Sequence, residues 1–138
     1  MPTVADGRGQ ESWGDQPALD LNRIAQLRQL GTMGGTDLLG RVTSLFLRDG
    51  KTSLAAVRQA STAHRAGDLG HELHKLKGTA SNLGAARVAA LCAQLEQETS
   101  EDPTEEPQAA EGPLLTSGQL DELELELDRA DQAIREAV

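Results

Sequence analysis

Residues 69–84 read LGHELHKLKGTASNLG, and the apolar positions in this stretch recur at steps of four, three, four and three. This spacing places them on one side of an α-helix, as in the seam of a helical bundle. Asp68 is a good N-cap residue and Gly84 a good stop, so the pattern predicts a buried-faced helix over residues 69–83. Its expected core positions are Leu69, Leu73, Leu76, Ala80 and Leu83.

Two further helical patterns precede this one. Asp20 predicts the N-cap of a short helix that ends in the glycines beginning at Gly31. A second helix is expected from Thr36 or Asp37 to about residue 65, bent or loosened at Gly50; two helices split at 49–51 are the alternative. The apolar stripes are Leu21, Ile24, Leu27 and Leu30, then Leu38, Val42, Leu45, Phe46, Leu54 and Val57, continued by Ser61 and His64.

Two helical patterns follow it. One covers about residues 85–99, and Cys92 fits there as a small buried apolar residue. Three prolines in residues 100–116 indicate a linker, after which a last helix is expected from Ser117. The stripes are Val88, Leu91, Cys92 and Leu95, then Leu120, Leu123, Leu127, Ala130 and Ile134.

The composition agrees with a helical fold. Leucine and alanine are abundant, whereas the aromatic residues are only Trp13 and Phe46, which disfavours a β-sandwich or barrel. Because the connections are short, the sequence predicts an all-α, antiparallel up-down four-helix bundle with a short additional N-terminal helix. We expect residues 1–17 to be a disordered leader, with Trp13 outside the core, and residues 18–138 to form the bundle.

Charge and cysteine content narrow the functional classes. The 138 residues carry a net charge of −9, which makes a general nucleic-acid binder a poor candidate. Residues 1–87 hold 11 basic and 8 acidic side chains, whereas residues 88–138 hold 2 basic and 14 acidic ones. One interpretation of this asymmetry is a mildly basic docking face beside an acidic half, and the other is a solvated acidic surface. The single cysteine and the lack of a signal peptide or apolar span predict a cytoplasmic protein without a membrane partner.

Residues 71–85, HELHKLKGTASNLGA, hold the candidate functional site. On a helical wheel His74 points outward beside the buried seam, and Lys77, Gly78 and Ser81 follow on the same side. A glycine inside a helix costs about 1 kcal/mol relative to alanine. Gly78 therefore suggests that stability is given up so that another surface can approach the imidazole of His74.

The run LHKLKGTASNLGA at 73–85 resembles the motif of histidine-containing phosphotransfer (Hpt) domains, and the resemblance extends over about residues 20–100. Leu73 departs from the pattern, because a small residue usually precedes the histidine. The resemblance implies that His74 is the phosphoacceptor, that Lys77 assists the phosphoryl group electrostatically and that Gly78 gives clearance. Ser81 would form a hydrogen bond near the site.

The resemblance also implies the partners. Hpt domains pass a phosphoryl group between aspartates of response-regulator receiver domains, or take it from a hybrid histidine kinase, in His–Asp phosphorelays. A neutral imidazole, with an unperturbed pKa of about 6.5, is a competent nucleophile for this chemistry. We expect Mg²⁺ to be held by the receiver and no cofactor or metal by this chain, which would act as a monomer.

Whether the chain is an enzyme in the strict sense stays open. A phosphocarrier would form a phosphohistidine intermediate, but the glycine-rich phosphate loops of an ATP-binding autokinase are missing. An Hpt-like regulator that binds a receiver or kinase without carrying phosphate is the alternative. A metal-dependent bundle enzyme is disfavoured, because the sequence pattern offers no third metal ligand beside His71 and His74. We expect His71 to be a solvent-exposed neighbour of the site.

Overall fold

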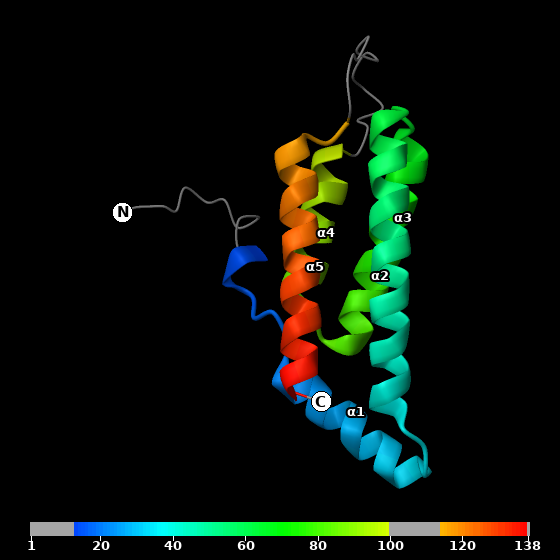
Figure 1. Ribbon diagram of the computed structural model, residues 1–138, viewed down its shortest axis with the longest axis vertical. Coiled ribbons are helices and arrows are strands. Elements are labelled where there is room, and N and C mark those ends of the chain that lie inside the picture. Colours follow the sequence, from blue (N-terminus) through cyan, green and yellow to red (C-terminus); the bar gives the residue numbers. More distant parts are fainter. Residues whose placement is uncertain (1–12, 100–113, 138) are drawn as a thin grey trace, which may run out of the picture.

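The computed structural model describes residues 13–99 and 114–137, and within these ranges it contains helices and no strand. Four helices stand side by side as an upright bundle, and the N-terminal helix crosses one end (Figure 1). This arrangement confirms the expected all-α bundle with an additional N-terminal helix. The helices are α1 (Leu21–Gly34), α2 (Leu38–Thr62), α3 (Ala66–Leu83), α4 (Ala86–Thr99) and α5 (Ser117–Ala137).

The bundle order places α3 and α5 at diagonal corners. Helices α2 and α4 each contact both of them, whereas α3 and α5 do not contact one another in the described residues. Helix α1 packs against α2 and α3 at the end of the bundle. A ligand bound beside α5 therefore leaves the outer face of α3 accessible.

The core confirms the stripe that was expected for α3. All five of its apolar positions are completely buried, and those of α4 are buried as well. A fully buried leucine contributes about 1.5–3 kcal/mol relative to an exposed one, so this shared seam holds α3 in a fixed rotation. The buried positions are Leu69, Leu73, Leu76, Ala80 and Leu83 in α3 and Val88, Leu91, Cys92 and Leu95 in α4.

Helix α2 runs through Gly50 without a break, as the preferred interpretation expected. Gly50 is buried beside α5, where a Cβ atom would lie 3.4 Å from Cδ2 of Leu127. The glycine thus permits a close approach of α5 rather than a helix end. Leu45 was expected on the buried stripe but is 44% exposed, because it lies off the face that meets the core.

The helix ends were predicted less well. Asp20 and Asp37 cap α1 and α2 as expected, but α3 starts earlier than predicted, at Ala66, with Asp68 in its first turn rather than at the cap. Helix α1 continues through Gly31, which is buried against the start of α2, and Leu30 is exposed. Helix boundaries are the part of the fold that apolar spacing specifies least.

His64 does not extend the buried stripe of α2. It is exposed, has a φ of 61° and lies in the turn between α2 and α3. The buried stripe ends instead at Ser61, whose hydroxyl accepts a hydrogen bond of 2.8 Å from the backbone N–H of Leu115. This bond fixes the entry into α5, and Ser117 begins that helix as expected.

Residues 13–17 contact the bundle, although the sequence pattern placed them in a disordered leader. Trp13 packs partly buried against the core, and Arg87 of α4 donates hydrogen bonds to the carbonyls of Gln16 (2.9 Å) and Pro17 (3.0 Å). Residues 1–12 and most of the expected linker, residues 100–113, lie outside the described part of the chain.

Candidate functional site

His74 lies in the middle of α3 and points away from the core, as the helical wheel predicted. Its side chain is 71% exposed, and its Nδ1 atom lies 3.4 Å from Oε2 of Glu96 on the neighbouring helix α4. A neutral imidazole carries its proton on one ring nitrogen and a lone pair on the other. With Nδ1 directed at a carboxylate, Nε2 is the nitrogen that is available to an electrophile from solvent.

Lys77 joins the same carboxylate from one turn further along α3. Its Nζ atom lies 2.8 Å from Oε1 of Glu96, and its side chain is 33% exposed. Glu96 is 24% exposed, so its ion pairs are partly sheltered from solvent. The structure thus brings two of the predicted site residues together through a third residue that the sequence did not identify as functional.

The face of α3 around His74 is built from small residues. Gly70 and Gly78 lie four residues before and after the histidine, and Gly67 continues the row towards the start of the helix. A Cβ atom at any of these glycines would meet nothing within 4 Å, so the packing of the bundle does not require them. The imidazole therefore projects from a smooth helical face that a large partner can approach.

Ser81 shares this side of α3 but does not reach His74. The two residues are seven positions apart, about 10 Å along the helix axis. In the described part of the chain the Ser81 hydroxyl forms no hydrogen bond, and it lines a shallow cavity beside Arg23 and Gly84 instead. A hydrogen bond from Ser81 near the site stays a prediction.

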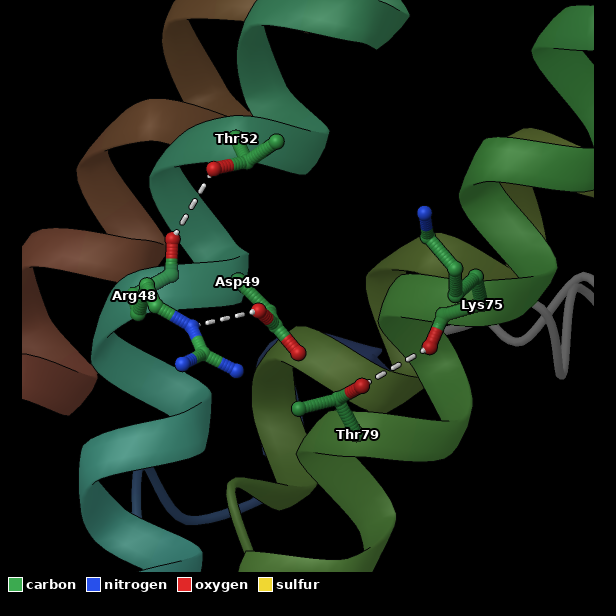
Figure 2. A network of polar contacts seen from close by, with 5 residues as sticks. All are labelled: Arg48, Asp49, Thr52, Lys75 and Thr79. Carbon is green, nitrogen blue, oxygen red and sulfur yellow. Dashed lines mark hydrogen bonds and ion pairs between the residues drawn. The ribbon is translucent and has the colours of Figure 1, made fainter.

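The opposite flank of α3 faces α2 and is occupied by local polar contacts (Figure 2). Arg48 pairs with Asp49 at 3.2 Å on α2, and the Thr79 hydroxyl donates to the Lys75 carbonyl at 3.1 Å on α3. Lys75 also pairs with Glu72 at 3.4 Å. The second lysine of the motif is thus engaged away from the imidazole, which leaves Lys77 as the cation of the site.

Cys92 lies beneath the site on α4. Burial, with a further contribution from the Glu96 carboxylate, raises the pKa of its thiol to about 12, although the charge of Lys77 acts in the opposite direction. The thiol is therefore protonated at neutral pH, and Cys92 serves as a core residue.

No cluster of three or more metal-ligating side chains occurs in residues 13–99 and 114–137. His71 is exposed on α3 and lies beside Arg65 and Asp68 at the edge of a small cavity. None of the described helices is long and apolar enough to cross a membrane.

The family model described as Hpt domain matches residues 41–133, which is most of the chain and includes α3, α4 and their site. No curated protein and no solved structure matches the chain.

Proposed function

This chain belongs to the Hpt domain family, the histidine phosphotransfer domains of two-component signalling, and from this premise we propose that His74 accepts and passes on a phosphoryl group in a His–Asp phosphorelay. The proposed donors and acceptors are aspartates of receiver domains, free or within a hybrid histidine kinase, which would supply Mg²⁺. The cytoplasm is the proposed location. The observation that supports the proposal is the exposed His74 imidazole whose Nδ1 lies 3.4 Å from the Glu96 carboxylate.

The geometry supports a balanced transfer step. The neutral imidazole of His74 keeps its proton on Nδ1, next to Glu96, and its Nε2 lone pair attacks the phosphorus of the receiver's aspartyl phosphate. The N–P bond forms as the P–O bond to the aspartate breaks, and the aspartate leaves as a carboxylate. In the onward step a carboxylate of another receiver attacks the same phosphorus and the electron pair returns to Nε2.

Lys77 and Glu96 have different electrostatic roles in this transfer. The Lys77 ammonium lies one turn from His74 and supplies positive charge near the phosphoryl oxygens, because phosphoryl transfer depends mainly on positioning and charge stabilisation. The Glu96 carboxylate lies 2.8 Å from this ammonium and 3.4 Å from the imidazole. We therefore assign Glu96 as a positioning residue for both.

The test is phosphoryl uptake from a phosphorylated receiver domain in the presence of Mg²⁺. His74→Gln should abolish uptake and leave the free energy of unfolding nearly unchanged, because the side chain is exposed. His71→Gln is the matched control: it changes the other exposed histidine of α3 and should be labelled like the wild type. Uptake that survives His74→Gln would contradict the proposal.

A second result would favour the regulator without carrier activity. If the chain binds receivers but is labelled by none of them, while the same receivers label an authentic phosphocarrier, the protein is a receiver-binding bundle. Lys77→Ala distinguishes the phosphocarrier from the regulator further, since in a phosphocarrier it should slow transfer without ending it.

A further inference from the structure

A cleft of about 370 Å³ lies between α2 and α5. Phe46, Leu47 and Leu54 of α2 and Leu127 of α5 form its apolar part, and Lys51 and Asp128 add one charge from each helix. The α2 residues that line it span positions 46–54 and the α5 residues span 124–131. At 1.5 Å per residue, the cleft is therefore about two helical turns long.

The cleft is remote from His74. It lies along α5, which occupies the corner of the bundle diagonal to α3. Gly50 contributes to its wall and lets α5 approach α2, since a Cβ there would lie 3.4 Å from Leu127. A molecule bound in the cleft and a receiver docked at His74 would occupy different sides of the bundle.

The charges of the cleft fall into two groups. At one end Glu124 is bound to Arg58 of α2 at 2.6 Å, and this pair closes the cleft across its two walls. Asp131 is bound to Arg135 within α5 at 2.8 Å. These carboxylates are neutralised by partners within the chain.

Lys51 and Asp128 form the second group, and neither has an ion-pair partner in the described residues. Lys51 lines the cleft from α2 and Asp128 lines it from α5, so the two charges stand on opposite walls. The walls therefore present one positive and one negative charge that do not meet, with an apolar floor between them.

We propose that the α2–α5 cleft docks an amphipathic helix of a partner protein, with an apolar ridge on the partly exposed Leu47, Leu54 and Leu127, an acidic flank towards Lys51 and a basic flank towards Asp128. The length of the cleft matches two turns of such a helix, and its opposed charges complement flanks of opposite sign. This docking site is independent of the phosphotransfer proposal, because it leaves His74 exposed.

Two designed 14-residue helical peptides test the proposal. Both carry leucines along one ridge; the first has a lysine flank and a glutamate flank, and the second has lysines on both flanks. The first peptide should bind the full chain more tightly than the second, and it should shift the backbone amide resonances of Gly50, Lys51 and Asp128 without shifting that of His74.

Charge variants of the chain locate the binding. Asp128→Lys should weaken binding of the first peptide about fivefold, because an attractive exposed pair is replaced by a repulsive one. Asp121→Lys is the matched control, since it makes the same charge change on the exposed part of α5 outside the cleft and should leave the affinity unchanged. Lys51→Glu should reverse the preference in favour of the second peptide.

Equal weakening by Asp128→Lys and Asp121→Lys would overturn the proposal, as would binding without any shift at the cleft or no binding at millimolar peptide. Sedimentation tests a different occupant: a dimer that Asp128→Lys dissociates would mean that a second copy of the chain fills the cleft, which also overturns the proposal. The His74→Gln variant should bind the first peptide with the affinity of the wild type. Peptide binding and phosphoryl transfer can therefore fail independently of one another.

Discussion

At the scale of single residues, Glu96 shows why sequence reasoning found only part of the site. His74, Lys77 and Gly78 lie within one helical turn of one another, so local spacing was enough to predict that they share a face. Glu96 is on another helix, and its contacts of 3.4 Å to His74 and 2.8 Å to Lys77 depend on the packing of α3 against α4. The one available signal was its place next to the buried Leu95, at the edge of the seam.

Glu96→Gln should slow phosphoryl uptake roughly tenfold without abolishing it, since loss of a charge-assisted contact of about 1.5 kcal/mol corresponds to such a factor. Initial rates of uptake from a phosphorylated receiver measure the effect. Glu72→Gln is the control, because Glu72 pairs with Lys75 on the same helix and does not contact His74. Equal slowing in both variants would remove Glu96 from the site.

At the scale of helices, the seam of α3 was predictable and its beginning was not. The rotation of the helix follows from apolar spacing that the chain itself carries, and all five predicted core positions are buried. The start at Ala66 instead depends on the turn after α2, in which the N–H of Arg65 bonds to the carbonyl of Ala60 at 2.9 Å. Contacts of this kind join elements whose relative placement the sequence pattern does not give.

Gly78 in α3 affects the free energy of unfolding and the access of a partner to His74 in opposite directions. Gly78→Ala should raise the free energy of unfolding by about 0.5–1 kcal/mol, because a Cβ there meets nothing within 4 Å and alanine is the better helix former. It should also slow phosphoryl uptake, because the methyl group stands one turn from His74 on the docking face. Urea unfolding and uptake rates measure the two effects.

Gly118→Ala provides the comparison in α5, at the corner of the bundle diagonal to α3. It is exposed and its nearest neighbour, the Thr116 hydroxyl, would lie at an ordinary 3.7 Å from the new Cβ. This variant should transfer phosphate at the wild-type rate. If Gly78→Ala also transferred at that rate, Gly78 would have no role in access.

At the scale of the whole molecule, Arg87 connects three parts of the chain. Its side chain on α4 bonds to the Gln16 carbonyl at 2.9 Å and lies 3.6 Å from the carboxylate of Glu126 on α5. Glu126 is only 2% exposed and is also paired with Arg129 at 2.9 Å. A buried carboxylate needs such compensation, so this cluster ties the N-terminal segment, α4 and α5 together.

Arg87→Ala should lower the free energy of unfolding by about 2–3 kcal/mol, because it removes one of two cations from a buried carboxylate. Chemical denaturation measures this loss. Arg135→Ala should change it by less than about 0.5 kcal/mol, since the pair with Asp131 is on the surface. Similar losses of unfolding free energy in the two variants would show that the Arg87 cluster does not tie the N-terminal segment, α4 and α5 together.

In the phosphotransfer that we propose, Nε2 of His74 carries the phosphoryl group while Nδ1 faces Glu96. The most direct test is a long-range ¹H–¹⁵N correlation spectrum of the chain after phosphorylation by a receiver domain and Mg²⁺. We expect one phosphorylated imidazole, that of His74, with phosphorus coupled to Nε2 and the proton retained on Nδ1. Phosphorus coupled to Nδ1, or a phosphoryl group on His64 or His71, would contradict it.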